Sequence, residues 1–464
     1  MSKMRKERDS MGEMDVPVEA LYGAQTARAV SNFPVSGWTM PREFIAALGT
    51  VKLAAATAHK QAGRIEADKA DAIIAAAREV IDGRWDEHFP VDVFQTGSGT
   101  SSNMNANEVV ANRAIQILGG RPGDRSVHPN DDVNRGQSSN DVIPTALHVS
   151  AAVAIDRELL PALNKLRDAL QTKADEFDRV VKIGRTHGMD AVPVRLGQEF
   201  GGYAAQVAEV IRRLGDALES LRQLPLGGTA VGTGLNAPEG FAPAAIEIIS
   251  RETDLEFREA GNHFAAQAAK DDVVFASGVV RMAAVAMGKI AGDIRLLSTG
   301  PRCGIGELHL PATQPGSSIM PGKVNPVMCE SVIQAACQVV GCDAAITAGA
   351  TGGVGSILEL NVAMPMMAWN ILTAIRVLSN VADVFVDKCI DGLQADEEHC
   401  HQLTEQSLAM CTALAPEIGY DQAAAIAHEA YETGKTIRRV CQEKQILPKD
   451  KLDDLLDAKR QTGK

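Results

Sequence analysis

The chain has 464 residues, with 46 Lys and Arg against 59 Asp and Glu, so its formal net charge is −13. An acidic chain repels phosphate backbones, and an aromatic content of 4% leaves few surfaces for base stacking, so we expect no nucleic-acid partner. Apolar residues at 45% and charged residues at 23% indicate a globular protein, long enough for two or three domains.

The N-terminal segment has no recognisable targeting signal. Residues 1–17 mix both charge signs and lack an apolar core, and their acidic residues argue against a transit peptide. The most apolar later stretch, 360–375, is interrupted by Asn361, Pro365 and Asn370. We therefore expect no transmembrane helix, no membrane partner and a cytoplasmic location.

Apolar residues recur at helical spacing along most of the chain. The pattern predicts helices over 43–80, with a break at Gly63, and then much longer ones. The longer patterns cover 141–179, 195–222, 264–299, 326–348 and 360–393. Together with the scarcity of aromatic residues they predict a mainly α fold. The long helices are apolar on most sides, which fits either a bundle completed by other subunits or the core of a monomer.

The cysteines give no sign of a structural framework. All eight lie between Cys303 and Cys441, with no CxxC pair and no Cys/His spacing of the kind that binds zinc. We expect reduced thiols, no metal and no cofactor.

Between the predicted helices lie loops rich in Gly, Ser, Thr and Asn, which is where function usually resides. They read 96-TGSGTSSNMNANE, 128-HPNDDVNRGQSSND, 184-GRTHGMDAVPV, 227-GGTAVGTGLN and 316-GSSIMPGKVNPVMCE.

The last of these loops has the composition of an anion site. Glycines at 316 and 322 permit close approach to a ligand, and Asn325 followed by Pro326 suits the start of a helix. Lys323 just before a helix N-terminus favours an anion, either a phosphate or a carboxylate. A serine in this positive field could act as an alkoxide base, although an ordinary loop that caps a helix has the same composition.

The same loop resembles the signature GSSxMPxKxNxxxxE of the fumarase/aspartase superfamily, with each fixed position present up to Glu330. The other loops, and the opening DSMGEMDVP…LYGAQTARA, extend the resemblance over nearly the whole chain. Within the superfamily the chain resembles class II, iron-independent fumarate hydratases. GRTH at 184–187 and SSND at 138–141 favour these over aspartases, which carry GRTQ and STND.

The resemblance implies a three-domain fold with a central bundle of long helices, which we divide into residues 1–137, 138–393 and 394–464. It also implies a hydro-lyase of the tricarboxylic acid cycle. That enzyme would hydrate fumarate reversibly to (S)-malate, by anti addition and elimination through an aci-carboxylate intermediate. A homotetramer with each active site built by three subunits is implied as well.

By the same resemblance, Ser317 is the base at C3, and Lys323 and Asn325 grip the reacting carboxylate. His187 acts on the hydroxyl side of the reaction, and Glu330 is its carboxylate partner. The residues implied to bind substrate are Ser98, Gly99, Thr100, Ser138, Ser139, Asn140, Thr186 and Ser318, together with Lys323 and Asn325. A second dicarboxylate site is implied at Arg125, His128, Asn130 and Asp131.

Two alternatives remain open from the sequence. One is an aspartate ammonia-lyase, which would need ammonia in place of water. The other is a structural homologue without activity, although such a protein should have lost one of the four residues Ser317, His187, Lys323 and Glu330, and all four are present.

Overall fold

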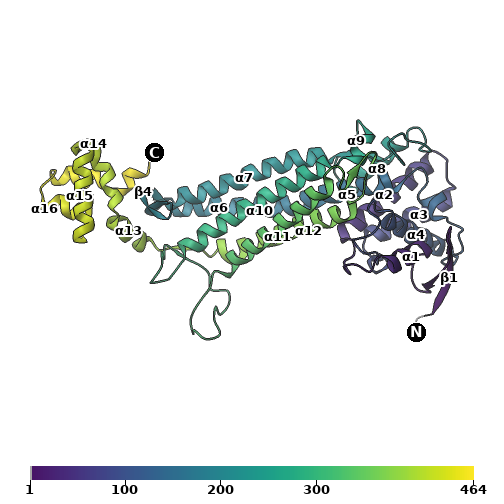
Figure 1. The fold of residues 1–464 in the computed structure, drawn as a ribbon, viewed down its shortest axis with the longest axis horizontal. Helices are drawn as coiled ribbons and strands as arrows, with labels where there is room; N and C mark the ends of the chain where they lie inside the picture. Colours follow the sequence, from purple (N-terminus) through teal and green to yellow (C-terminus); the bar gives the residue numbers. More distant parts are fainter. Residues whose placement is uncertain (1–2, 464) are drawn as a thin grey trace. The chain divides into compact units, whose positions relative to one another are not determined.

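The computed structural model describes residues 3–463, and its regular structure is mainly helical, as predicted (Figure 1). Over this range the strands pair only in twos. The pairs are β1 (Met4–Asp9) with β2 (Gly12–Pro17), β3 (Val181–Thr186) with β4 (Met189–Arg195), β5 (Gln223–Leu224) with β6 (Arg258–Glu259), β7 (Leu308–His309) with β10 (Gln394–Ala395), and β8 (Ser356–Ile357) with β9 (Leu360–Asn361).

The chain divides into two compact units. Unit 1 runs up to Pro161 and adds Arg212–Ala284 and Cys337–Ser379, whereas unit 2 comprises Ala162–Ile211, Val285–Ala336 and the chain from Asn380 onward. Several long helices contribute residues to both units. The division into three domains at 137/138 and 393/394 stays a prediction.

Unit 1 is organised around α2 (Arg42–Gln61), which packs against α3, α4, α5 and α8. Its side chains Phe44, Leu48 and Val51 recur at helical spacing and are buried. The other helices of the unit are α1 (Ala24–Asn32), α3 (Ala67–Ile81), α4 (Thr100–Ile117), α5 (Ser139–Ala154), α8 (Phe241–Thr253) and α9 (His263–Ala268), with parts of α10 (Asp271–Leu297), α11 (Val327–Ala350) and α12 (Met364–Phe385).

Unit 2 holds the remaining parts of the long helices and a C-terminal cluster of short ones. Its own helices are α13 (Glu397–Gln406), α14 (Ala415–Ile418), α15 (Tyr420–Thr433), α16 (Ile437–Glu443) and α17 (Lys449–Leu455). It also holds α6 (Leu160–Glu176) from Ala162 onward and α7 (Leu196–Leu221) up to Ile211, whereas the last part of α7 belongs to unit 1. The C-terminal helices share a small core around Leu414, Ile426 and Val440.

Short 3-10 and π turns complete the helical structure. They are η1 (Asp86–His88), η2 (Pro129–Val133), η3 (Ile155–Leu159), η4 (Phe177–Arg179), η5 (Val386–Ile390), η6 (Leu408–Leu414) and η7 (Ala458–Thr462).

Most predicted helices are confirmed, with two corrections to their bounds. The break at Gly63 separates α2 from α3, and this glycine has a φ of +64°. The pattern over 264–299 is two helices, because Ala269 is extended and α10 restarts at the acidic pair that begins with Asp271. The last long helix starts only at Met364, after strand β9.

Within residues 3–463, three helices are long and apolar enough to cross a membrane by length and composition alone, namely Asp271–Leu297, Val327–Ala350 and Met364–Ile390. The expectation that the chain has no transmembrane helix stays a prediction. In each helix a window of 18 residues holds at most two Asp, Glu, Lys or Arg residues, so the charged residues lower the hydropathy of that window only a little. In their most apolar windows 56%, 39% and 61% of the residues are buried against the rest of the chain.

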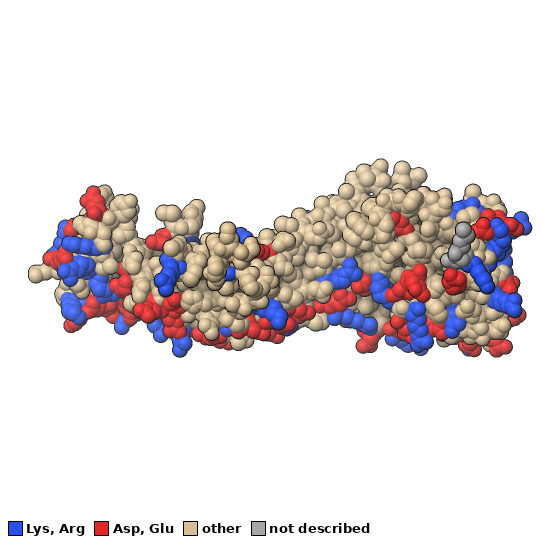
Figure 2. All heavy atoms as spheres, turned by 90° about the horizontal axis from the view of Figure 1, so that it is seen from below, with Lys and Arg blue, Asp and Glu red and all other residues tan. Residues whose placement is uncertain are grey.

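The remaining residues of these helices leave apolar side chains at the surface. Phe275, Val285 and Val340 are 45%, 57% and 42% exposed. Figure 2 shows broad areas of the drawn face without Lys, Arg, Asp or Glu. Such surfaces are typical of contacts with another protein chain.

Candidate functional site

The first turns of α4 and α5 lie together in unit 1 and are linked by hydroxyl groups. The hydroxyl of Thr100 lies 2.9 Å from that of Ser98 and 2.7 Å from that of Ser139. Gly99, with a φ of +75°, provides the left-handed turn before Thr100 starts α4. The structure therefore brings together two loops that are far apart in sequence, since the contacting residues Thr100 and Ser139 are separated by 39 positions.

The start of α5 is held by a capping box. Ser138 accepts from the backbone N–H of Asn140, and the carboxylate of Asp141 accepts from that of Ser138 at 2.9 Å. The side-chain amide of Asn140 donates to the carbonyl of Ala230 at 2.7 Å, so the 227–234 loop lies beside this site.

Asp141 is fully buried and anchors that loop as well. Its Oδ2 accepts from the backbone N–H groups of Gly227 and Thr229, both at 3.0 Å. Burial raises the pKa of this carboxyl, whereas the backbone hydrogen bonds and the charge of Lys52 act against the rise. Asp141 was not among the predicted site residues, although the SSND motif contains it.

Two helix N-termini side by side form a favourable site for an anion. Each carries partial positive charge, and here the hydroxyls of Ser98, Thr100 and Ser139 add hydrogen-bond donors. The arrangement suits a carboxylate, which accepts several hydrogen bonds at once.

His187 lies at the tip of the β3–β4 hairpin in unit 2. It and Gly188 have φ angles of +57° and +73°, as a type I′ turn requires. A left-handed histidine is uncommon and is held here by the hairpin. The side chains of His187 and Thr186 are exposed and make no hydrogen bond or ion pair with any residue in 3–463.

Buried charges fix the base of this hairpin. Arg185 donates to Oε2 of Glu307 at 2.9 Å, and a second nitrogen lies 2.9 Å from Oε1. The ammonium of Lys182 lies 3.3 Å from the same carboxylate and 3.0 Å from Glu199. Burial raises the pKa of Glu199. Sequence reasoning missed Glu307 because it lies outside every motif, 122 residues from Arg185.

The 316–325 loop is closed on itself in the connection between α10 and α11, where a loop extends away from the helices (Figure 1). The N–H of Gly316 donates to the carbonyl of Lys323 at 2.8 Å, and the amide of Asn325 donates back to that of Gly316 at 2.6 Å. A Cβ on residue 316 would lie 2.5 Å from the Lys323 oxygen, so only glycine fits.

The hydroxyl oxygen of Ser317 accepts two hydrogen bonds that would also stabilise it as an anion. Its Oγ accepts from the backbone N–H groups of Ile319 at 3.2 Å and Met320 at 3.0 Å. Hydrogen bonds donated to an oxygen favour its charged form, so both lower the cost of an alkoxide at Ser317.

The rest of the predicted site is exposed or differs from expectation. Helix α11 begins at Val327, so Pro326 occupies the capping position and the predicted cap at Asn325 is wrong. Asn325 closes the loop instead. Ser318 and Lys323 are exposed. Over residues 3–463 the side chains of Lys323 and Glu330 make no hydrogen bond or ion pair, so Glu330 is not paired with His187 there.

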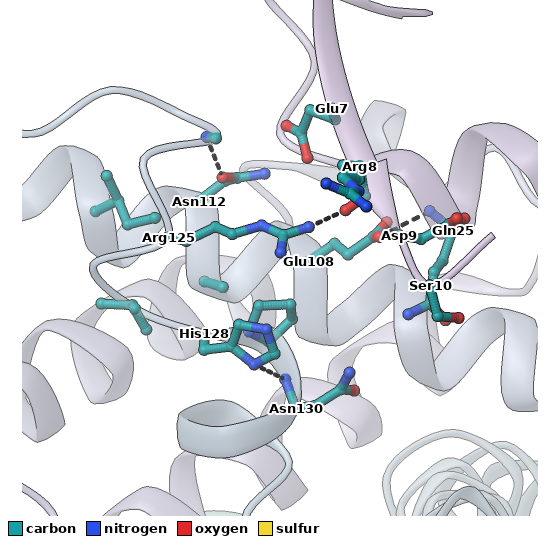
Figure 3. A pocket seen from close by; sticks show the side chains of 15 residues that line it. Glu7, Arg8, Asp9, Ser10, Gln25, Glu108, Asn112, Arg125, His128 and Asn130 are labelled. Atoms are coloured by element: carbon teal, nitrogen blue, oxygen red, sulfur yellow. Dashed lines mark hydrogen bonds between the residues drawn. The ribbon is translucent and has the colours of Figure 1, made fainter. Parts of the chain in front are cut away.

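The predicted second dicarboxylate residues partly line one hollow of about 420 Å³ in unit 1 (Figure 3). Arg125 donates to the carbonyl of Arg8, and Nδ1 of His128 accepts from the N–H groups of Asn130 and Asp131 at 3.3 and 3.1 Å. Asp131 lines a different hollow, of about 650 Å³, that shares Asn130.

The walls of the first hollow also include residues that sequence reasoning did not assign. Its lining contains the N-terminal hairpin residues Glu7, Arg8 and Asp9, and the buried Glu108. Glu108 is occupied, since it accepts from the backbone of Gly23 and from both donors of Thr26 and so supports the fold.

Comparisons with known proteins extend over both units. A family described as lyase matches residues 12–341, and one described as fumarase C C-terminus matches 410–463. Fumarate hydratase class II of Halobacterium salinarum is 54% identical over 458 residues, covering 99% of this chain and 97% of its own. The protein of that name from Mycobacterium tuberculosis is 52% identical, covering 96% and 92%.

Solved structures give the same result. Class II fumarase from Schistosoma mansoni matches with a TM-score of 0.96 at 40% identity, over 99% of each chain. A fumarate lyase/delta crystallin from Brucella melitensis, solved bound to cobalt, matches with a TM-score of 0.95 at 44% identity, over 100% of each chain.

Proposed function

The chain belongs to the class II fumarate hydratase family, with its mainly α fold, and on that premise we propose how its residues catalyse the hydration of fumarate. The reaction is reversible, and its other partner is (S)-malate. The observation that carries the proposal is the pair of backbone N–H groups that donate to Ser317.

In the direction of dehydration, Ser317 as alkoxide takes the proton from C3 of malate. The electron pair of the broken C–H bond moves into the adjacent carboxylate and forms the dianionic aci-carboxylate. This intermediate then expels the hydroxyl group from C2, and the C2–C3 double bond of fumarate forms. Hydration runs through the same steps in reverse, with anti addition of the two groups.

Stabilising the aci-carboxylate is the main electrostatic demand of the reaction. Lys323 and Asn325, close to Ser317 in the same loop, are proposed to bind the carboxylate on which charge develops. Thr186 and Ser318 add hydroxyl donors. The ammonium of Lys323 is free of ion pairs within residues 3–463, so its charge is available for a substrate.

The starts of α4 and α5 are proposed to bind the carboxylate whose charge stays constant. Their donors come from Ser98, Gly99 and Thr100 on one side and from Ser138, Ser139 and Asn140 on the other. Local donors are needed because a chain with a net charge of −13 repels a dianion at long range.

His187, with Glu330 as its partner, is proposed to give the leaving hydroxyl its proton and to take one from water in the reverse direction. Since neither side chain makes a hydrogen bond or ion pair within residues 3–463 of one chain, we propose that they meet between subunits of a homotetramer. The exposed apolar side chains of α10 and α11 support such an assembly.

We further propose that the reaction serves the tricarboxylic acid cycle in the cytoplasm, with no metal, other cofactor or membrane. The hollow at Arg125 and His128 is proposed as a second dicarboxylate site, because it offers cationic and amide donors.

An absorbance assay of fumarate tests the function. Purified protein should consume fumarate in ammonium-free buffer and form (S)-malate. Consumption that depends on ammonium would identify an aspartate ammonia-lyase, and no consumption under either condition would identify a homologue without activity.

A further inference from the structure

A fully buried lysine lies next to the starts of α4 and α5. Lys52, on α2, is 0% exposed. Its ammonium donates to the side-chain oxygens of Asn103 at 2.8 Å, Asn134 at 2.9 Å and Gln137 at 3.0 Å. The three N–H bonds of an ammonium are thus all used, each on an uncharged amide.

The three acceptors belong to the two segments that form the proposed carboxylate site. Asn103 lies in the first turn of α4, three residues after Thr100, whereas Asn134 and Gln137 lie in the segment that leads to the α5 cap at Ser138. The amide of Asn103 also donates to Asn134 at 3.2 Å. Lys52 therefore joins the two segments through one network.

The amide groups that Lys52 holds are themselves tied to the loop backbone. Asn134 donates to the carbonyl of Gln137 at 3.1 Å, and Gln137 donates to that of Val133 at 3.0 Å. Asn134 and Gln137 also line the 650 Å³ hollow together with Ser138. Removing the ammonium would take this donor away from the side-chain oxygens of Asn103 and Gln137, leave Asn134 only its bond from Asn103, and free this wall to move.

Burying a cation here is costly, which argues against a role in packing alone. Burial lowers the pKa of Lys52 to about 7, although the charge of Asp141 opposes the shift. Among residues 3–463, Asp141 of α5 is the one charged group whose field shifts this pKa. The groups that contact the ammonium from α4 and from the segment after η2 are the uncharged amides of Asn103, Asn134 and Gln137.

We propose that Lys52 is a positioning residue for dicarboxylate binding, which holds the starts of α4 and α5 at the spacing that one carboxylate of the substrate requires. The inference rests on the proposed function, since it concerns the same site. Lys52 acts through Asn103, Asn134 and Gln137 rather than by touching the substrate.

The test compares Lys52→Met with Lys270→Met in the full-length assembly. Lys270 is a matched control, because it is also fully buried with a pKa lowered by burial to about 7, and its ammonium donates to the carbonyl of Ala266, away from this network. Initial rates of fumarate hydration are measured as a function of fumarate concentration for wild type and both variants.

Lys52→Met should raise the KM by about tenfold or more and change kcat by less than about threefold. The reason is that the starts of α4 and α5 are proposed to hold one substrate carboxylate equally well in the ground state and in the transition state. Lys270→Met should keep KM within about twofold of wild type. A folded Lys52→Met assembly with unchanged KM, or an equal rise in both variants, overturns the inference. An inactive wild type instead overturns the proposed function.

The pH profile of KM gives a second readout. A bound dianion favours protonated Lys52, so the KM of wild type should rise as pH increases above about 7, and this part of the rise should be missing in Lys52→Met. If the ratio of the two KM values is constant from pH 6 to 9 (about the range set by that pKa), the inference is contradicted.

If Lys52→Met does not fold, Gln137→Leu removes one acceptor and should raise KM by a smaller factor, and an unchanged KM there overturns the inference.

Discussion

The two regions that we assign to one reaction are built in different ways. At the starts of α4 and α5, nearly every polar side chain is bonded within its own unit, through the hydroxyls of Thr100 and Ser139 and the capping box of Ser138. In the 316–325 loop and at the hairpin tip, the side chains of Lys323 and His187 make no such bonds within residues 3–463.

Exposure separates the two regions as well. Ser98 is 8% exposed, whereas Ile319, Met320 and Met189 near the proposed base and acid are 83%, 49% and 70% exposed. This difference supports our proposal that each chain preorganises the region that binds the substrate, whereas the region proposed for proton transfer is completed by assembly.

The largest expected effect comes from the 316–325 loop, where the side chains make few hydrogen bonds. Ser317→Ala removes the proposed base and should lower kcat by about 10³-fold or more, because general-base catalysis contributes on the order of 10²–10⁴. The fumarate absorbance assay measures the rate, and size-exclusion chromatography checks that assembly is retained. Turnover near that of wild type would remove Ser317 from its role.

A second effect should be nearly as large. His187→Asn should lower kcat by about 10²-fold or more, because it removes the group that exchanges the proton of water. Glu330→Gln should be less severe, and the double variant should be no slower than His187→Asn alone if the two residues act together. Effects that multiply would contradict the pairing, and the comparison of kcat among the three variants decides it.

A smaller effect is expected in the preorganised region. Ser139→Ala removes one donor to a carboxylate and should raise the KM for fumarate by about tenfold, since a hydrogen bond to a charged group contributes about 1.5–3 kcal/mol. Steady-state kinetics at several fumarate concentrations measure it. A fall in kcat with unchanged KM would reverse the assignment of the two regions.

Removal of metal ions is expected to have no effect on activity. Incubation with EDTA should leave activity unchanged, because no group of three or more His, Cys, Asp or Glu side chains within residues 3–463 is placed to hold a metal ion. The assay compares chelated protein with protein resupplied with divalent metal. A reproducible loss that metal restores would show that neither region accounts for catalysis as we describe it.

Much of the fold and the candidate site follows from the sequence, because both depend on local patterns. Helical periodicity predicts the break at Gly63, and the motif loops contain Ser317 and His187. The break at Ala269 was missed, since apolar spacing continues across it while the backbone becomes extended. The apolarity of the long helices was underestimated, because single interruptions such as Asn361, Pro365 and Asn370 were given too much weight.

Contacts between distant residues could not be predicted in this way. The pairing of Arg185 with Glu307 and the three bonds of Lys52 depend on tertiary packing, and neither Glu307 nor Lys52 lies in a motif. Asn325 was assigned to cap α11 from its residue type, whereas the tight closure at Gly316 claims its side chain. Residue type predicts what a side chain can bond to, and packing decides which partner is present.

The central claim is that separate chains complete each active site, and subunit mixing tests it most directly. Ser317→Ala and His187→Asn chains, each expected to lose kcat by about 10²-fold or more alone, are coexpressed with different tags, and mixed tetramers are isolated. If Ser317 and His187 at one site come from different chains, about one site in four should be intact and the mixed tetramers should regain activity in that proportion. Mixed tetramers that form but stay as inactive as the single variants would contradict the account.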